Sequence, residues 1–301
     1  MLVGSARFTG GGHQSAVPAP PPPAEPRQGS QAATTPVHAD DAQPPVRLTG
    51  LAAGRRLLPP QSRVAYVRAM FSAIAPRYDL TNTVISAGLH RRWKRETVRL
   101  LAPPPGARVL DVCCGTGDLA RLLAGAVGAH GLVIGVDFAA PMVRQARRRM
   151  RQGDGTRPSP GGGAAAPIAY LVGDALTLPF PDATFDGVTV GFGLRNLADP
   201  LAGLRELRRV LRPGGRLAVL EFARVRRPLL RALYDLYSFT LLATLGRLVS
   251  RHPDAYLYLP VSVRHWPDQA GVLKMMEEAG FQDPRARDLA GGIVAVYTAQ
   301  A

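Results

Sequence analysis

Apolar and polar positions follow two different periods along residues 63–301. Compact apolar runs, which predict buried strands, cover 108–113, 132–137, 168–174, 186–193 and 216–222. Between them, apolar residues three or four positions apart predict helices over 119–127, 141–151 and 201–211. Strands that alternate with helices in this way predict an α/β fold with a parallel, doubly wound sheet. A further helix is predicted over 268–279, and two strand-like runs, 281–289 and 292–299, are expected to pair as a hairpin.

Two helical segments precede the first predicted strand. Val67, Phe71 and Ile74 follow helical spacing, a turn is expected at residues 75–76, and the second segment ends near Lys94. These segments are predicted to form a lid or a flanking helical layer.

The first 60 residues differ in composition from the rest of the chain. They hold eleven of the 28 prolines and few large apolar side chains, so they cannot bury enough apolar surface to offset the entropy lost on ordering. We therefore expect residues 1–60 to be a disordered extension and residues 61–301 to be one domain. An organelle transit peptide is the alternative for the extension, because no acidic residue precedes Glu25. Such peptides are richer in Ser and Arg than in Pro, which counts against this alternative.

Charge and hydropathy limit the class of protein without selecting a partner. A net charge of +15 and a pI near 11.0 suit nucleic acid, an anionic membrane surface or no specific partner. Because no uncharged apolar run reaches the ~20 residues of a bilayer-spanning helix, we expect a cytoplasmic protein, in solution or at a membrane surface. The only cysteines, Cys113 and Cys114, are adjacent, and no third cysteine could complete a metal cage, so no metal is expected.

Glycine and acidic residues follow the first two predicted strands, where ligands of doubly wound sheets bind. Gly115 and Gly117 allow a tight turn and a close approach to a ligand, although two glycines alone are a weak signal. Asp137 ends the second strand, and a carboxylate there can accept hydrogen bonds from both hydroxyls of a ribose. The alternative for Asp137 is an N-cap of the next helix. The pattern favours an adenosine-containing ligand.

Two carboxylates near the glycine loop favour one adenosine ligand over another. A dinucleotide needs a free helix N-terminus for its pyrophosphate, but Asp118 takes that end and Asp111 lies in the preceding strand. Carboxylates repel pyrophosphate and attract the ammonium and sulfonium groups of S-adenosylmethionine. The alternatives are a helix N-cap for Asp118 and a buried hydrogen-bonding group for Asp111. The sign of the charge therefore predicts the methyl donor.

Residues after the third and fourth strands extend this prediction. Asp174 is expected to accept from the adenine amino group and the Ala175 amide to donate to a ring nitrogen, with an Asx-turn as the alternative for Asp174. The segment 191–196 lacks the Asn/Asp-Pro-Pro-aromatic sequence expected of an N6-adenine methyltransferase. Neither cysteine lies where the nucleophile of an RNA C5-pyrimidine methyltransferase is expected. We therefore expect no nucleic-acid partner, and an RNA methyltransferase remains an alternative supported by charge alone.

Several short segments are typical of one enzyme family. They are RYD at 77–79, GTGD at 115–118, GLRN at 193–196, RVLRPGG at 209–215 and YDLYSF at 234–239. GLRN and YDLYSF are the most particular of these. From about Tyr66 to its end, the chain resembles the demethylmenaquinone and 2-methoxy-6-polyprenyl-1,4-benzoquinol C-methyltransferase family. The resemblance implies the Rossmann-like fold of class I S-adenosylmethionine-dependent methyltransferases, mostly parallel, with an antiparallel C-terminal strand and N-terminal flanking helices.

The resemblance also implies a set of residues that bind the donor. They are Asp111, Gly115, Thr116, Gly117, Asp137, Asp174, Ala175 and Gly191. Gly191 stands where the family often has Ser, so a hydroxyl contact is expected to be lost there.

The implied reaction is C-methylation of demethylmenaquinol in menaquinone biosynthesis, with the benzoquinol of ubiquinone biosynthesis as the alternative substrate. Menaquinone is preferred because the chain has no firm organelle signal. A quinol carbon is a poor nucleophile until a hydroxyl with a pKa of about 10 loses its proton. Arg195 is expected to stabilise the phenolate, and Asn196 and Tyr78 to orient the ring or a water. The alternatives are a surface salt bridge for Arg195 and a core aromatic for Tyr78.

Two features of this reaction stay open in the sequence. His90 and Glu221 are candidates for the general base, and neither is preferred. The polyprenyl tail needs an apolar path, and residues 229–249 combine Leu, Tyr and Phe with neighbouring arginines. We expect this segment to contact the membrane surface or to line a channel for the tail; the alternative is a core or dimer helix. The sequence does not determine the oligomeric state.

Overall fold

The computed structural model describes residues 60–153, 164–226, 228, 232 and 254–301. The predicted extension, apart from residue 60, lies outside the described residues. So do YDLYSF and nearly all of the predicted membrane or tail segment.

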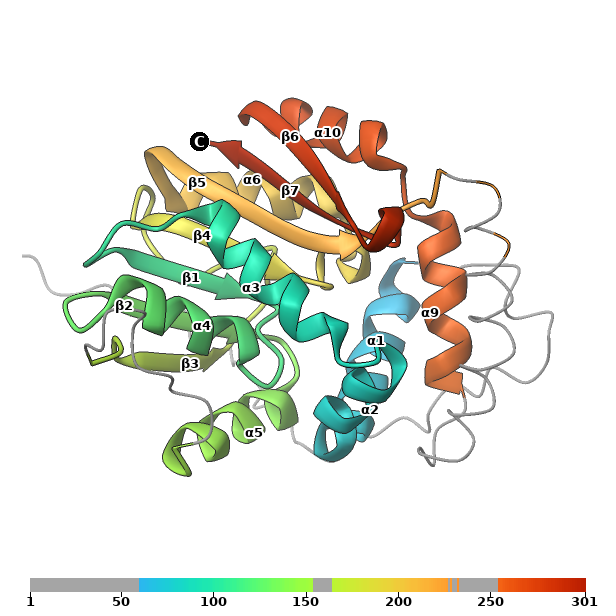
Figure 1. Cartoon of the computed structure of the whole chain (residues 1–301), viewed down its shortest axis with the longest axis horizontal. Coiled ribbons are helices and arrows are strands. Elements are labelled where there is room, and N and C mark those ends of the chain that lie inside the picture. Colours follow the sequence, from blue (N-terminus) through green and yellow to red (C-terminus); the bar gives the residue numbers. More distant parts are fainter. Residues whose placement is uncertain (1–59, 154–163, 227, 229–231, 233–253) are drawn as a thin grey trace, which may run out of the picture. The chain divides into compact units, whose positions relative to one another are not determined.

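A seven-stranded sheet in the order β3-β2-β1-β4-β5-β7-β6 forms the centre of the domain (Figure 1). Its strands are β1 (Arg108–Val112), β2 (Leu132–Asp137), β3 (Ile168–Val172), β4 (Phe185–Gly191), β5 (Leu211–Phe222), β6 (Gln282–Leu289) and β7 (Val294–Gln300). The first five pair in parallel, and β7 runs antiparallel to both β5 and β6. The predictions of a mostly parallel sheet, an antiparallel last strand and a C-terminal hairpin are confirmed.

Helices cover both faces of this sheet. They are α1 (Pro60–Ile74), α2 (Tyr78–Ile85), α3 (Leu89–Leu101), α4 (Asp118–Val127), α5 (Ala140–Arg151), α6 (Pro200–Val210), α9 (Asp254–His265) and α10 (Gln269–Glu278). The helices predicted between the strands occur with ends shifted by one residue. Helix α9 was not predicted, because Pro260 in its sequence is typical of a break.

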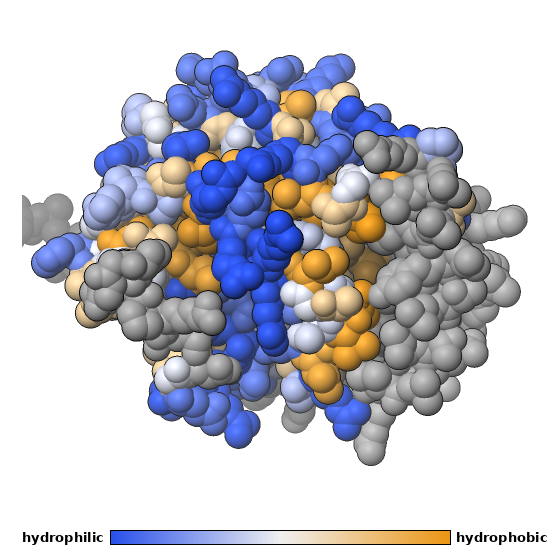
Figure 2. All heavy atoms as spheres, viewed as in Figure 1, coloured by the Kyte–Doolittle hydropathy of each residue, from blue (hydrophilic) through white to orange (hydrophobic). Residues whose placement is uncertain are grey.

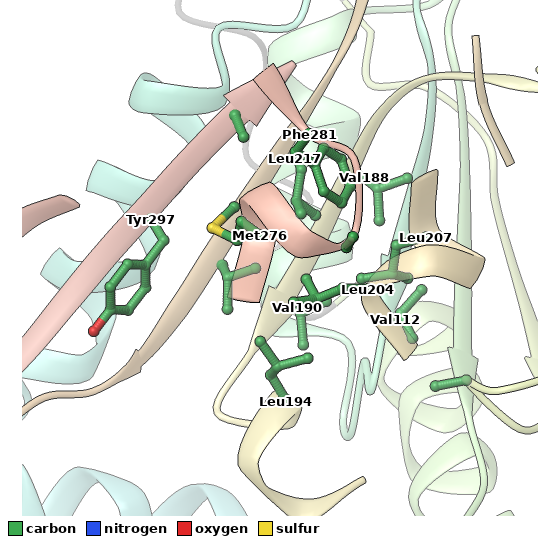
Figure 3. Close-up of a cluster of buried hydrophobic side chains, with 14 of the residues drawn as sticks. Val112, Val188, Val190, Leu194, Leu204, Leu207, Leu217, Met276, Phe281 and Tyr297 are labelled. Atoms are coloured by element: carbon green, nitrogen blue, oxygen red, sulfur yellow. The ribbon is translucent and has the colours of Figure 1, made fainter. Parts of the chain in front are cut away.

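The alternation of side chains along the strands produces two hydrophobic cores. Val109 on β1 belongs to the core that includes α3, α4 and α5, whereas the next residue, Leu110, belongs to the core that includes α6 and α10. Figure 3 shows the second core, where Leu204 and Leu207 of α6 and Met276 of α10 meet strand residues. Each large side chain buried in this way contributes about 1.5–3 kcal/mol to folding.

Several strand ends differ from the prediction, including that of β3 at Val172 instead of residue 174, and three of the differences have local reasons. Left-handed backbone at Cys113 (φ 56°) and Phe192 (φ 57°) ends β1 and β4 before the predicted residues. Strand β5 begins at Leu211 rather than at Arg216, because Leu211 pairs with Phe185 and Arg216 with Gly187 across a register shift. The Pro-Gly-Gly segment therefore lies inside β5, where it interrupts the pairing with β4, and does not come before the strand. The early strand ends leave their last residues in loops at one edge of the sheet.

Candidate active site

An open cavity of about 770 Å³, here called the strand-end cavity, lies at the carboxyl ends of β1, β2 and β4. The chain order reverses beside β1, whose neighbours are β2 and β4, and ligands of doubly wound sheets bind at such a switch point. Five predicted donor-site residues line it, namely Gly115, Asp137, Asp174, Ala175 and Gly191. The wall therefore collects residues from four separate loops of the sequence.

Asp137 is held rigidly at the end of β2. Its Oδ2 accepts a hydrogen bond from the Gly115 amide at 2.9 Å, and its Oδ1 accepts one from the Ala139 amide at 2.9 Å. Burial raises the pKa of the carboxyl, although these two bonds oppose the shift. The N-cap of α5 is Ala139, without a side-chain cap, so the alternative role predicted for Asp137 is wrong. Its carboxylate instead fixes the glycine loop and faces the cavity.

The two loop glycines have different roles. Gly115 (φ 53°) lines the cavity. Gly117 has φ 82°, and a Cβ there would lie 2.3 Å from the hydroxyl oxygen of Tyr170. Gly117 is absent from the walls of the cavities described here. It therefore shapes the loop by packing, and its predicted contact with the donor stays a prediction.

Thr116 and Asp118 belong to a network of charged side chains beneath the loop. Lys94 Nζ lies 2.7 Å from Asp118 Oδ2, and Arg149 Nη1 lies 3.1 Å from Asp118 Oδ1. Arg121 also pairs with Asp118. Burial alone would raise the pKa of Asp118, but Lys94, Arg121 and Arg149 lower it below its usual range.

This network corrects one argument from the sequence. Asp118 was expected to repel a pyrophosphate by its charge, but three cations compensate that charge in the structure. Asp118 is the first residue of α4 rather than its N-cap, which is Gly117. Thr116 is buried and donates a hydrogen bond from Oγ1 to Asp79 Oδ1 at 2.6 Å. Of the two carboxylates in that argument, only Asp111 in β1 forms no ion pair among the described residues.

Asp111 is fully buried and only half satisfied by hydrogen bonds. Its Oδ1 accepts from Thr189 Oγ1 at 2.8 Å, and its Oδ2 has no partner among the described residues. Burial raises its pKa to about 7, against the hydrogen bond from Thr189 and the charge of Lys94. Asp111 lines a smaller cavity that shares Gly115 and Gly191 with the strand-end cavity. An unpaired buried carboxylate oxygen beside a cavity is suited to receive a cationic or hydrogen-bonding group of a ligand.

Asp174, Ala175 and Gly191 complete the strand-end wall. Asp174 is exposed, and its Oδ1 accepts from the Leu176 amide at 2.9 Å, which is the Asx-turn foreseen as its alternative. Ala175 is buried. At Gly191, a Cβ would lie 2.7 Å from Cδ1 of Leu119. A side chain at position 191 would therefore clash with Leu119 unless Leu119 moved.

A second cavity, open to solvent and with about 830 Å³ of empty space, is here called the aromatic cavity and lies beside the first. Its apolar wall includes Phe71, Trp93, Phe192, Phe222 and Tyr258. Its polar side chains include Tyr78, Thr81, Asn82, Ser86, His90, Lys94 and Arg195. Phe71, Tyr78 and Phe192 belong to the walls of both cavities. The two cavities therefore meet at a boundary made of aromatic side chains.

Arg195 forms a buried ion pair rather than the surface salt bridge foreseen as its alternative. Its Nη1 lies 2.8 Å from Glu221 Oε1 and donates to the Phe192 carbonyl at 2.8 Å. Its Nε donates to Ser262 Oγ at 3.3 Å. Among the described residues, Nη2 has no hydrogen-bond partner. Arg195 therefore presents a fixed guanidinium to the aromatic cavity, with one nitrogen available for a ligand.

Tyr78 and Asn196 lie at the boundary of the cavities. Burial raises the pKa of Tyr78 to about 12, partly opposed by the side chain of Asn82, so its hydroxyl stays protonated and can donate. Asn196 lines the strand-end cavity, and its Oδ1 accepts from the hydroxyl of Tyr258 at 3.0 Å. Tyr78 is half-buried and lines both cavities, so it is not only a core aromatic.

The sequence did not single out the aromatic wall. Trp93 and Phe192 contact each other with ring centroids 6.4 Å apart, and Phe192 and Phe222 with centroids 4.9 Å apart. They come from α3, from the loop after β4 and from the end of β5. In sequence, such residues look like ordinary core positions, because helical spacing and strand alternation do not distinguish a core from a lined cavity.

The family model gives the class of this protein, a methyltransferase, and the fold agrees with it. The fold is similar to that of a S-adenosylmethionine-dependent methyltransferase from Thermotoga maritima, with a TM-score of 0.52 and 18% identity over 77% of this chain and 98% of the other. The chain belongs to the ubiE/COQ5 methyltransferase family, whose model matches residues 60–301.

Named relatives cover most of the same region. The chain is 42% identical to the ubiquinone/menaquinone biosynthesis C-methyltransferase UbiE of Ectopseudomonas mendocina, over 80% of this chain and 90% of the relative. It is 43% identical to the enzyme of the same name from Methylococcus capsulatus, over 81% and 95%. It is 44% identical to the demethylmenaquinone methyltransferase of Beutenbergia cavernae, over 78% and 90%. The family resemblance inferred from the sequence is confirmed.

Proposed function

We propose that this methyltransferase transfers a methyl group from S-adenosylmethionine to a ring carbon of demethylmenaquinol. The observation that carries the proposal is the shared boundary of the two cavities at Tyr78 and Phe192. On one side lies the carboxylate of Asp137, and on the other lies the guanidinium of Arg195. A donor and an aromatic acceptor in these cavities would meet at the boundary, which is the arrangement that methyl transfer requires.

The strand-end residues fit an adenosine-containing donor. Asp137 would accept from the ribose hydroxyls, and Asp174 with the Ala175 amide would bind the adenine edge. The unpaired oxygen of Asp111 would receive the amino group of the methionine part, in the smaller cavity that also contains Thr116. When bound, S-adenosylmethionine supplies an electrophilic methyl group on a sulfonium.

The aromatic cavity fits the quinol ring. Nη2 of Arg195 would stabilise the phenolate, because a charge-assisted hydrogen bond favours the ionised form. The hydroxyl of Tyr78, protonated because of its raised pKa of about 12, would donate a hydrogen bond to an oxygen of the ring. Asn196, bonded to Tyr258, would hold the boundary in place. No residue of this set needs to form a covalent bond with the substrate.

The identity of the quinol is the finer part of the proposal. The relatives from Ectopseudomonas and Methylococcus are named for ubiquinone and menaquinone, and that from Beutenbergia for demethylmenaquinone alone. The benzoquinol precursor of ubiquinone is therefore the second candidate substrate. Menaquinone appears in both sets of names, and we choose demethylmenaquinol as the substrate for that reason.

We propose that a substrate with a polyprenyl tail brings the enzyme to a membrane, at its cytoplasmic face. Leu80, Val84 and Leu89 are exposed on α2 and at the start of α3, at 58%, 38% and 44% of their full surface. In Figure 2, which has the same view as Figure 1, apolar surface is visible around α2 and the start of α3. It lies next to a band of hydrophilic side chains over the rest of α3. None of the helices in the described ranges has the length and apolar character to cross a bilayer. We propose peripheral contact through this apolar surface, next to the aromatic cavity.

The decisive experiment is transfer of labelled methyl from S-adenosylmethionine to short-tailed demethylmenaquinol and, in parallel, to the demethylated benzoquinol. Product from the first alone supports the proposal as stated. Product from the benzoquinol alone would replace the substrate and keep the reaction. If neither quinol is methylated while the donor binds, the quinol proposal is wrong. RNA would then be tested as acceptor, since the net charge of +15 is its only support.

Flotation with liposomes tests the membrane contact separately. Leu80→Ser combined with Leu89→Ser is expected to reduce binding to vesicles that contain anionic lipid, because it removes two exposed apolar side chains. Unchanged flotation of the double variant would contradict the proposed contact surface. Activity on a tail-free quinol is the control for intact folding.

A further inference from the structure

His90 lies in the wall of the aromatic cavity with its ring held in one orientation. It is the second residue of α3, and its side chain is buried with 5% exposed. Ser86 Oγ donates to the Asn82 carbonyl at 2.6 Å and lies 2.8 Å from Nδ1 of His90. A hydroxyl has one hydrogen. Because that hydrogen is used toward Asn82, Nδ1 must be the donor toward Ser86.

This arrangement leaves the other ring nitrogen as an acceptor. With the hydrogen on Nδ1, the neutral imidazole has its lone pair on Nε2. Among the described residues, Nε2 has no hydrogen-bond partner, and His90 is part of the cavity wall. The lone pair of Nε2 is therefore available to a molecule bound in the aromatic cavity.

Three other ionisable groups in the wall of the aromatic cavity already carry a proton in the resting enzyme. Arg195 and Lys94 are cations paired with acidic residues, and Tyr78 stays protonated. Glu221 is excluded as well. Its Oε1 accepts from Arg195 Nη1 and from the Phe222 amide, its Oε2 accepts from the Arg195 amide, and it is absent from the wall. Of the two candidate residues, only His90 therefore has an acceptor atom that is free to take a proton.

We propose that Nε2 of His90 removes the proton from the methylated ring carbon. This proposal rests on the proposed quinol function. Methyl transfer forms a C–C bond with an electron pair of the phenolate ring and breaks the S–CH₃ bond, so the sulfonium becomes a thioether. The ring carbon then carries both the methyl group and its original hydrogen, and the ring is a dienone. His90 takes that hydrogen as a proton, the C–H electron pair restores the aromatic ring, and the proton passes to solvent.

The basicity of His90 suits this step better than removal of the hydroxyl proton. Burial and the charge of Lys94 lower the pKa of His90 to about 4, so the ring is neutral near pH 7 but a weak base. A phenol with a pKa of about 10 would give up its proton to such a base only at a large energetic cost. The C–H of the dienone is far more acidic, because its loss restores aromaticity. A weak neutral base is sufficient for it.

A purely structural role for His90 is the competing explanation. Ser86 Oγ also accepts from the backbone amide of His90 at 3.3 Å, so the same contacts stabilise the turn between α2 and α3. A structural role and a chemical role predict different kinetic results. They can be separated with a quinol that carries deuterium at the reacting ring carbon.

The test compares His90→Ala with Arg92→Ala, which changes an exposed residue of the same helical turn. We expect His90→Ala to lower kcat by roughly 10²–10⁴-fold, the usual contribution of a general base, with the Kd of the donor unchanged. Deuterium should slow the His90→Ala variant and leave the wild type unaffected, because proton loss becomes rate-limiting. Added imidazole should restore part of kcat. An equal rate for both isotopologues without rescue by imidazole would assign His90 to the turn and overturn the proposal.

A measurement on the wild type covers the case in which His90→Ala fails to fold. Nitrogen-15 NMR of the histidine ring is expected to show the hydrogen on Nδ1, and addition of the quinol is expected to shift Nε2. A resting enzyme with its hydrogen on Nε2 would overturn the proposal. If the wild type methylates neither quinol, the proposed function itself is wrong. This outcome can be distinguished from a failure of the His90 proposal alone.

Discussion

Nη1 of Arg195 and Oε1 of Glu221 lie 2.8 Å apart in an ion pair whose side chains are 5% and 0% exposed. The pair joins the loop after β4 to the end of β5, two parallel neighbours in the sheet. It fixes the guanidinium that we propose as the phenolate partner. Glu221 therefore acts on the position of Arg195, and its removal would leave an uncompensated cation beside the cavity.

Replacing Arg195 is expected to affect stability and catalysis together. Arg195→Ala leaves the carboxylate of Glu221 buried without an opposite charge, which costs about 3–5 kcal/mol of the free energy of unfolding. The double variant Arg195→Ala with Glu221→Gln should recover much of that stability, because the buried charge is gone. It should not recover methyl transfer. Urea unfolding and kcat measured on both variants separate the effects. Recovery of activity in the double variant would contradict the role of Arg195.

Asp137→Ala is expected to weaken donor binding by roughly 10–100-fold, which corresponds to about 1.4–2.8 kcal/mol for hydrogen bonds to a charged group. Calorimetric titration with S-adenosylmethionine measures it. Asp174→Ala is the matched comparison and should lose less, because that side chain is exposed and its Oδ1 already closes an Asx-turn. A larger loss at Asp174 than at Asp137 would place the donor differently from our proposal.

The stability of the protein should depend on pH through Asp111. Its pKa is raised from 3.8 to about 7 by burial. Between these values the folded state keeps a proton that the unfolded state has released, so stability falls as pH rises through this window. Asp111→Asn lacks this group. Urea unfolding at pH 5 and pH 8 should therefore show the wild type losing stability relative to Asp111→Asn at the higher pH; an equal pH dependence would contradict the raised pKa.

The donor should respond to the same group in the opposite direction. Its ammonium is attracted by the ionised form of Asp111, so the affinity of the wild type for S-adenosylmethionine is expected to increase as pH rises through about 7. Calorimetric titrations from pH 6 to pH 8 measure this, with Asp111→Asn as the control. A wild-type affinity that is flat over this range would remove Asp111 from the donor site.

Two glycines allow backbone strain to be separated from steric conflict. Gly117→Ala places a Cβ 2.3 Å from the Tyr170 hydroxyl oxygen at φ 82°, whereas Gly88→Ala has φ 77° in the same left-handed region and nothing within 4 Å. The strain common to both is about 1–2 kcal/mol, and the clash should add to it in Gly117→Ala alone. Thermal unfolding of the two variants is the measurement. Equal losses would show that the loop moves to accommodate the methyl group.

Local signals in the sequence determined much of the fold. Periodicity located the strands and the helices between them, because burial on one face or on both leaves a pattern in neighbouring residues. The same signals placed Asp137 after β2 and the glycines after β1. They failed at α9, where Pro260 obscures the helix, and at the start of β5, where the Pro-Gly-Gly segment lies inside the ladder.

The chemistry of the site depended on the tertiary structure. Lys94 and Arg149 compensate Asp118 from helices 24 and 31 residues away in sequence, and Glu221 reaches Arg195 across 26 residues. The hydrogen on Nδ1 of His90 follows from one hydroxyl and one carbonyl in the preceding turn. By itself, the sequence determined which residues carry charge and where strands end. Which charges are paired, and which lone pairs face a cavity, is decided only when the order of the strands brings distant segments together, since electrostatic interactions act over a few ångströms of space and not along the chain.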